Sequence, residues 1–328
     1  MSIIQVADLV KKYGDFEAVK GVSFQVEQGE TFGFLGPNGA GKTTTINILC
    51  TLLRPTSGSA ILDGWDVAKH PSRVRQSIGL VFQDPSLDDR LTAEENLNFH
   101  AILYNVPPSV RGQRIADVLQ MVELEDRRRS IVRTFSGGMR RRLEIARGLL
   151  HYPKVLFLDE PTIGLDPQTR NHIWKYITEL REREKITIFL TTHYMDEANN
   201  ADRIAIIDHG KIVALDSPDA LKAGVGGDII RLKTENDAAV LSELKEKYGL
   251  HGRPIESGIQ VEVAGAEEFV PKLFAGLRTR IISVSLHRPT LDDVFLTLTG
   301  REIREDEANN KNMVRAWMRA RSSGRGPH

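Results

Sequence analysis

Alternating and continuous apolar runs occupy the beginning of the chain. Residues 3–10, 18–30 and 31–36 form such runs, and Gly, Asp or Lys bounds each of them. This spacing is typical of strands joined by tight turns. A Gly-rich loop and the apolar segment 43–53 follow, and we predict a helix over that segment. The pattern therefore indicates strands that lead into a loop and a helix.

The apolar spacing becomes helical between about residues 85 and 150. Continuous apolar runs then return at 155–160, 186–193 and 203–215, and residues 169–184 between the first two have helical spacing. Uninterrupted apolar strands alternating with helices are typical of a mostly parallel sheet that is buried on both faces. We therefore predict an α/β domain that contains a helical insertion.

Glycines cluster between Ser217 and Gly227, which indicates a domain boundary. Strand-like and helix-like segments alternate beyond it, enough for a small α+β module. The residues from Lys311 onward include five basic residues and no acidic residue, as in a solvated, disordered tail. We therefore predict three parts, with the helical insertion at about 86–150: a first domain over 1–220, an α+β domain over 221–306 and a basic, disordered tail over 307–328.

Composition limits the function classes. The chain has 328 residues, enough for two domains, and its 44 Lys+Arg balance its 44 Asp+Glu. This balance gives no whole-chain argument for nucleic-acid binding, and we expect no nucleic-acid partner. The single cysteine, Cys50, cannot close an intramolecular disulfide, so we expect a reducing cytoplasm. Without an 18-residue uncharged apolar stretch, we expect the chain to act at a membrane only by docking on a partner.

One loop carries a phosphate-binding pattern of the form G-x-x-x-x-G-K-[ST] between a predicted strand and a predicted helix. Its residues are Gly36, Pro37, Asn38, Gly39, Ala40, Gly41, Lys42 and Thr43. Glycines let successive backbone N–H groups approach phosphates, and the helix N-terminus adds a favourable dipole. Lys42 would supply a positive charge and Thr43 a hydroxyl ligand for Mg²⁺. The loop therefore predicts a nucleotide site.

An acidic pair, Asp159 and Glu160, ends the apolar run 155–160. A carboxylate at the carboxyl end of such a strand lies beside the phosphate loop in a doubly wound sheet. Asp159 is placed to hold Mg²⁺ through water, and Glu160 to polarise an attacking water. Together with the loop, this pair predicts nucleotide hydrolysis.

A second anion-binding pattern, Ser136-Gly137-Gly138, opens the apolar helical segment that ends near residue 150. A capping serine and flexible glycines at a helix N-terminus form such a nest. One nucleotide does not need two nests from one chain. The economical interpretation is that this nest serves a nucleotide held by another copy.

At these residues, over about 3–220, the sequence resembles the ATP-binding-cassette (ABC) ATPases. The resemblance implies a P-loop α/β core with an antiparallel β subdomain and a helical subdomain, and ATP with Mg²⁺ as cofactors. It also implies a head-to-tail dimer, in which the phosphate loop of one copy and Ser136-Gly137-Gly138 of the other enclose ATP. Phe135 and Met139 depart from the commonest Leu-Ser-Gly-Gly-Gln signature.

Further positions take roles only through this resemblance. Tyr13 matches the aromatic residue that stacks on adenine, and Thr44 belongs to the nucleotide-binding loop. Gln83 matches the glutamine that senses Mg²⁺ and the attacking water, and it opens the loop that faces the membrane partner. Asp166, in Gly-Leu-Asp-Pro, lies in the loop that connects the two ATP sites. His193 matches the switch histidine that bonds the γ-phosphate and orients Glu160.

The stretch 287–306 is similar to the end of the daunorubicin/doxorubicin-resistance exporter ATPases, which carry a Leu-Asp-Asp-Val-Phe-Leu segment. This similarity implies an ATPase subunit that drives efflux of drugs or other lipophilic compounds. It would act through a separate membrane permease, bound to the cytoplasmic face of the membrane. Two alternatives stay open: another ABC system for lipid or polysaccharide export or for solute import, and a soluble nucleic-acid- or ribosome-associated ABC ATPase.

Overall fold

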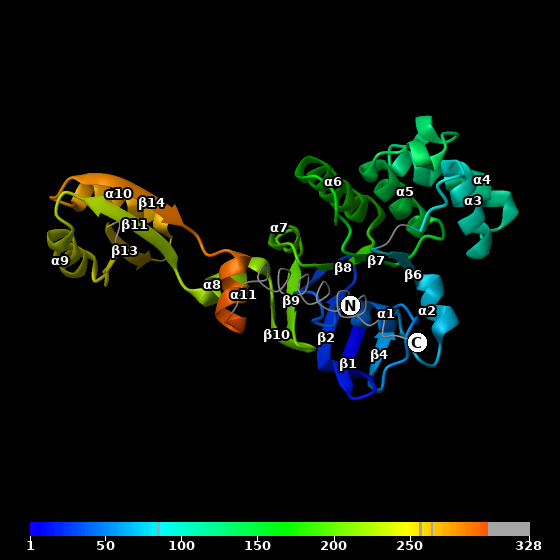
Figure 1. The fold of residues 1–328 in the computed structure, drawn as a ribbon, viewed down its shortest axis with the longest axis horizontal. Helices are drawn as coiled ribbons and strands as arrows, with labels where there is room; N and C mark the ends of the chain where they lie inside the picture. The colour runs from blue at the N-terminus through cyan, green and yellow to red at the C-terminus, as the bar shows by residue number, and fades with distance from the viewer. Residues whose placement is uncertain (84–85, 256–257, 264, 301–328) are drawn as a thin grey trace, which may run out of the picture. The chain divides into compact units, whose positions relative to one another are not determined.

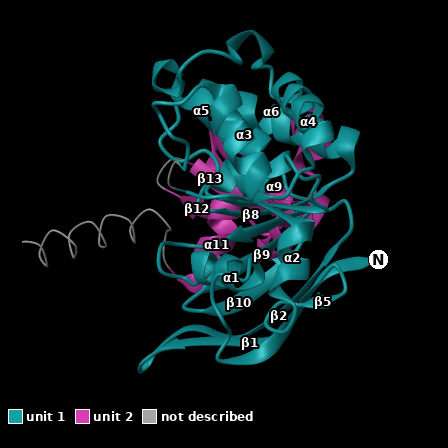
Figure 2. Ribbon diagram, turned by 90° about the vertical axis from the view of Figure 1, so that its right-hand side faces the viewer, with its two compact units in different colours: residues 1–217, 303–328 teal, residues 218–302 magenta. Residues whose placement is uncertain are grey.

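The structure is a computed structural model, and it describes residues 1–83, 86–255, 258–263 and 265–300. These residues fall into two compact units, Met1–Ser217 and a second unit that begins at Pro218 (Figure 2). The tail predicted over 307–328 lies outside the described residues. Within the described ranges, no helix is both long and apolar enough to cross a membrane.

A six-stranded sheet forms the centre of the first unit, in the order β10-β9-β3-β8-β7-β6 (Figure 1). The strands are β3 (Thr31–Leu35), β6 (Ile78–Val81), β7 (Val155–Asp159), β8 (Thr187–Thr192), β9 (Arg203–Asp208) and β10 (Lys211–Asp216). All neighbouring pairs are parallel except β9 and β10. The predicted parallel sheet is confirmed, but the run 203–215 is a hairpin that turns at His209 and Gly210, both with positive φ.

Alternating side chains of β7 separate two cores. Leu156 and Leu158 pack with the helices of the first unit, whereas Val155 and Phe157 pack with an antiparallel sheet and helix α1 (Lys42–Leu49). The antiparallel sheet has the order β2-β1-β4-β5. Its strands are β1 (Ser2–Tyr13), β2 (Phe16–Glu27), β4 (Ser57–Leu62) and β5 (Trp65–Asp66). The central sheet is therefore covered on both faces.

A group of helices of the first unit lies on the face of the central sheet opposite α1 (Figure 1). They are α3 (Ala93–Leu103), α4 (Pro108–Met121), α5 (Gly137–Leu149) and α6 (Pro167–Glu184). Two short 3₁₀ turns, Glu125–Arg127 and Val132–Thr134, lie between α4 and α5. Helix α3 begins with a capping box between Thr92 and Glu95. Two short helices, α2 (Pro71–Ser77) and α7 (Met195–Ala198), complete the unit. Helix α1 ends at Leu49, earlier than predicted, because Thr51 adopts a positive φ of 63°.

The second unit contains a four-stranded antiparallel sheet of order β12-β13-β11-β14 with its own apolar core. Its elements are α8 (Pro218–Val225), β11 (Asp228–Thr234), α9 (Asp237–Tyr248), β12 (Arg253–Ile255), β13 (Gly258–Val263), α10 (Ala266–Gly276), β14 (Ile281–His287) and α11 (Leu291–Thr299). From β11 to β14 they follow the split β-α-β-β-α-β arrangement. Ile230, Leu232, Ile259 and Val261 alternate along β11 and β13 and form the centre of this core. The predicted small α+β module is confirmed.

Candidate active site

The phosphate loop connects β3 to α1, and its glycines are required by the backbone. Gly39 and Gly41 have φ values of 83° and 107°, a region that favours glycine. A Cβ at Gly36 would lie 2.3 Å from the Ile207 carbonyl oxygen, and one at Gly41 would lie 2.6 Å from the Ala18 carbonyl oxygen. No side chain caps the N-terminus of α1 at Gly41. The first N–H groups of this helix are therefore left for an anion.

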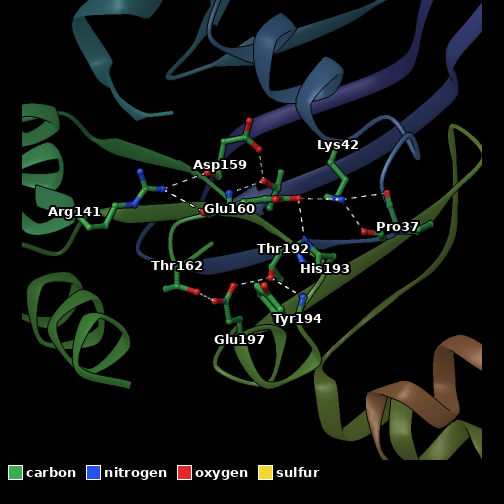
Figure 3. Close-up of polar contacts among 12 residues, drawn as sticks. Pro37, Lys42, Arg141, Asp159, Glu160, Thr162, Thr192, His193, Tyr194 and Glu197 are labelled. Carbon is green, nitrogen blue, oxygen red and sulfur yellow. Dashed lines mark hydrogen bonds and ion pairs between the residues drawn. The ribbon is translucent and has the colours of Figure 1, made fainter. Parts of the chain in front are cut away.

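A buried ammonium, carboxylate and imidazole meet beside this loop (Figure 3). Lys42 Nζ donates to the carbonyl oxygens of Gly36 at 2.7 Å and Pro37 at 3.2 Å. The same Nζ lies 3.5 Å from Glu160 Oε1, and His193 Nδ1 lies 3.1 Å from that oxygen. Glu160 therefore contacts the phosphate-loop lysine and the strand-end histidine through one oxygen atom.

Parallel strand order brings Glu160 and His193 together. Glu160 directly follows β7 and His193 directly follows β8, its neighbour in the sheet. Glu160 adopts a positive φ of 47°, and its N–H donates to the Thr191 carbonyl oxygen at 3.1 Å. A positive φ is uncommon for a residue other than glycine. It directs the carboxylate toward the end of β8 and the phosphate loop.

The two adjacent carboxyl groups have opposite pKa shifts. Burial raises the pKa of Glu160, but the His193 hydrogen bond and the Lys42 charge outweigh burial, so the pKa lies below its usual value. For Asp159, burial is the dominant cause and raises the pKa, although hydrogen bonds from Thr191 and Thr43 lower it in part. Glu160 is therefore an anion at neutral pH that can accept a proton.

The residues around Asp159 fit a nucleotide-bound Mg²⁺ ion. Asp159 Oδ1 accepts a hydrogen bond from Thr191 Oγ1 at 2.5 Å, and Thr43 also bonds its carboxyl group. Mg²⁺ is usually held by one or two carboxylates, water and substrate phosphates rather than by an all-protein cage. The described residues contain no group of three or more His, Cys, Asp or Glu that could hold a metal ion by themselves.

The other predicted site residues lie outside this buried cluster, on exposed ends of other elements. Tyr13 is exposed at the end of β1, with Lys11 Nζ 5.3 Å from its ring centroid. Gln83 is exposed after β6, and no hydrogen bond between described residues joins its side chain to Asp159 or Thr43. The structure therefore places these two side chains at the surface.

Two helix N-termini carry four of the other predicted residues, Ser136, Gly137, Gly138 and Asp166. Ser136 Oγ accepts the Met139 N–H at 3.3 Å and caps α5. Gly137 follows it, exposed, and Gly138 is half-buried. Asp166 Oδ1 accepts the Thr169 N–H at 3.0 Å and caps α6.

Sequence reasoning missed Arg141, which is 7% exposed in α5. Its guanidinium donates to the carbonyl oxygens of Pro161 at 2.5 Å and Phe82 at 2.7 Å, and it pairs with Glu144 at 2.8 Å. Burial lowers the pKa of Arg141, and Glu144 opposes that shift. The available signal was the i, i+3 spacing of Arg141 and Glu144 on an otherwise apolar helix face. Arg141 joins α5 to the segments that follow β6 and β7.

Sequence reasoning also missed Glu197, a carboxylate that is 1% exposed in α7. It accepts hydrogen bonds from Thr162 and Thr192 (Figure 3). Its only sequence signal is a position four residues after a strand-end histidine. That signal is too common to have singled it out.

Comparisons with known proteins agree on one family. Residues 19–163 match the family described as ABC transporter. The linearmycin resistance ATP-binding protein LnrL of Bacillus subtilis (strain 168) is 38% identical over 312 residues, covering 92% of this chain and all of that protein. The daunorubicin/doxorubicin resistance ATP-binding protein DrrA of Streptomyces peucetius is 40% identical over 306 residues, covering 90% of this chain and 92% of that protein.

A solved structure extends the likeness to the fold. A dimeric ATP-binding cassette in a post-hydrolysis state, bound to ADP and Pi, aligns with a TM-score of 0.59 and 29% identity. The alignment covers 65% of this chain and 98% of that cassette. Because sequence identity extends over almost the whole length of both relatives, the chain belongs to the ABC transporter family as an ATP-binding, ATP-hydrolysing subunit.

Proposed function

We propose that Lys42, Glu160 and His193 carry out ATP hydrolysis in this chain, and that the hydrolysis drives export through a separate membrane permease. The observation that carries the proposal is the meeting of these three side chains at the ends of neighbouring parallel strands. This is the edge of a sheet at which nucleotides bind in doubly wound folds. The arrangement supports in-line attack of water on a phosphate held by the loop.

Each side chain has a distinct task in the proposed site. Glu160 accepts the proton of the attacking water, and His193 holds the Glu160 carboxylate in orientation through the contact at 3.1 Å. The Lys42 ammonium, buried beside the loop carbonyls, stabilises phosphate oxygens. Thr43 and Asp159 are the proposed ligands of Mg²⁺, with Gln83 beside it, and the ion supplies charge neutralisation when bound.

The exposed residues take the remaining roles in this proposal. Tyr13 stacks on adenine, and Thr44 binds phosphate together with the loop backbone. Ser136 and Gly137 are exposed at the N-terminus of a 13-residue helix, which suits an anion from outside the same copy. We therefore infer a head-to-tail dimer, in which this nest of one copy meets the nucleotide of the other and Asp166 lies in the loop between the two sites.

A groove in the first unit supports docking of a membrane permease. It has a volume of about 710 Å³ and is lined by residues of α2, β6, α5 and the loop after α3. Its lining includes Leu52, Phe82 and Leu103, and each of these apolar side chains is more than a third exposed. Exposed apolar side chains around a groove are typical of a protein interaction site. A permease helix in this groove would hold the chain at the cytoplasmic face of the membrane.

The proposed cargo follows from the relatives and not from the site. Two relatives that align over almost their whole length are named for resistance to linearmycin and to daunorubicin/doxorubicin. We therefore propose that the exported compounds are drugs or other lipophilic molecules. The permease would select among them, since the described part of this chain has no helix that could span a membrane.

Replacement of Glu160 tests both steps of the proposal. Glu160→Gln should lower ATP turnover by about 10²- to 10⁴-fold, because the general base is lost, while ATP binding persists and a closed dimer accumulates. In cells that express the chain with its permease, efflux of a fluorescent lipophilic drug should fall with turnover. The matched control is Glu182→Gln, an exposed glutamate of α6. Normal turnover by Glu160→Gln would overturn the assignment of the base, and normal efflux without turnover would overturn the coupling.

A further inference from the structure

We propose that Glu197 is a positioning residue, which holds the turn that carries His193 in a fixed place against the loop that follows Glu160. The proposal rests on the function proposed above for His193. Glu197 acts through hydrogen bonds to two threonines. Three sets of contacts carry it.

The Glu197 carboxylate joins two segments through its two oxygens. Oε2 accepts a hydrogen bond from Thr192 Oγ1 at 2.6 Å, and Oε1 accepts one from Thr162 Oγ1. Thr192 directly precedes His193, and Thr162 lies two residues after Glu160. Thr162, Thr192 and Glu197 are each no more than 1% exposed. A buried carboxylate with both oxygens engaged fixes the spacing between the two segments.

Both threonines also organise the backbone around the site. Thr192 Oγ1 accepts the Tyr194 N–H at 2.9 Å, which fixes the turn on either side of His193. The Thr192 carbonyl oxygen accepts the N–H of Gly36 at 3.3 Å, at the start of the phosphate loop. The Thr162 carbonyl oxygen accepts the Leu165 N–H at 3.1 Å, in the loop proposed to connect the two ATP sites. The Thr192–Glu197 hydrogen bond therefore fixes the backbone on both sides of His193.

Helix α6 supports the same carboxylate. Arg170 Nε lies 4.0 Å from Glu197 Oε1, and its guanidinium lies 4.0 Å above the Tyr194 ring. The Tyr194 and His193 rings are 4.1 Å apart. Burial raises the pKa of Glu197, and the hydrogen bond from Thr192 lowers it in part. These contacts connect α6 to the imidazole that contacts Glu160.

The test is a double-mutant cycle on the full-length chain, measured as Mg²⁺-dependent ATP hydrolysis. Glu197→Leu removes both acceptors and should lower kcat by about 10- to 100-fold, with KM for ATP changed less than about threefold. In a His193→Ala background the same substitution should have almost no further effect, because Glu197 acts through His193. The matched control, Asp196→Leu, changes an exposed carboxylate of the same helix and should leave kcat unchanged.

A milder pair keeps the test decisive if Glu197→Leu does not fold. Thr162→Val removes one donor and should lower kcat, whereas Thr162→Ser keeps the hydroxyl and should preserve it. Equal losses on Glu197→Leu with and without His193 would overturn the positioning role while leaving the function of His193 intact. Undiminished turnover by His193→Ala alone would instead overturn the proposed function, and the role of Glu197 with it. A rise in KM at constant kcat would also overturn the positioning role.

Discussion

At the residue scale, the surroundings of each buried side chain decide its charge. Asp159 and Glu160 are neighbours in the sequence and are 4% and 6% exposed, yet their pKa values shift in opposite directions. Lys42 and His193 face Glu160, whereas Asp159 has mainly hydroxyl partners. Two carboxyl groups with separated pKa values allow one to serve as a base and the other as a metal ligand.

His100 gives a pH prediction at this scale. Burial, together with the charge of Arg147, lowers the pKa of His100 from 6.5 to about 4. Between these two values the unfolded chain binds more protons than the folded chain, so the free energy of unfolding decreases as the pH falls through this window. Above pH 6.5, His100 is neutral in both states, and its full contribution to the free energy of unfolding is present.

Replacing His100 with Gln should therefore reduce the loss of stability on acidification. The measurement is urea unfolding of both proteins at about pH 7 and about pH 5. Both proteins have the same carboxyl groups, so the titration of these groups changes the two free energies of unfolding equally. The difference between the two free energies of unfolding should be smaller in His100→Gln. The same difference in both proteins would contradict the prediction.

At the scale of elements, one buried arginine fastens helix α5 to the central sheet. Arg141 bonds the backbone after β6 and after β7, and its partner Glu144 also accepts the Ser86 N–H at 2.9 Å. Helix α5 begins at the Ser136-Gly137-Gly138 nest, in which Ser136 and Gly137 are exposed. The same helix therefore connects the surface proposed to meet the second copy with the strand ends that carry the acidic pair.

Loss of this fastening should be costly. Arg141→Met should lower the free energy of unfolding by about 3 kcal/mol or more, because the buried Glu144 loses its only positively charged partner among the described ion pairs. Adding Glu144→Leu should recover part of that loss. Arg142 provides the control, since it pairs with the exposed Glu123, and Arg142→Met should cost less than about 1 kcal/mol. Denaturant unfolding measures all three changes, and equal costs for Arg141→Met and Arg142→Met would contradict the prediction.

At the scale of the whole molecule, two units have separate apolar cores. The phosphate loop, the acidic pair and His193 all belong to the first unit. The second unit has its own core around Ile230, Leu232 and Leu244. Cores of this kind support units that fold on their own.

Nucleotide should consequently stabilise the two units unequally. In calorimetry, ATP with Mg²⁺ at about 100 times its Kd should stabilise the first unit by about 2.7 kcal/mol and leave a second transition in place. Leu232→Ala removes buried volume from the core of the second unit. It should lower the free energy of unfolding of that unit by about 2 to 5 kcal/mol and leave nucleotide binding unchanged. A single unfolding transition for the whole chain, shifted by nucleotide, would contradict the independent unfolding of the two units.

The sequence alone determined the features that depend on neighbouring residues. The phosphate-loop pattern, the acidic pair after an apolar run and the helical spacing of α3 to α6 are all contiguous, so their local geometry follows from their own residues. Strands β3, β7 and β8 were predictable because parallel strands buried on both faces are uniformly apolar. In contrast, β4, β5 and α2 were not predicted, because these elements are short and β4 is formed through pairing with β1.

Only the tertiary structure decided which distant side chains meet. The order β8-β7 in the sheet brings His193 to Glu160, 33 residues earlier in the chain. Arg141 finds the Phe82 carbonyl oxygen 59 residues away, and Glu197 finds Thr162 at a separation of 35 residues. A charged side chain in a sequence does not reveal whether it will be buried, since burial depends on strand order and on the packing of helices from elsewhere. The motifs of the site could therefore be predicted from the sequence, whereas the buried residues that connect its segments could be identified only from the tertiary structure.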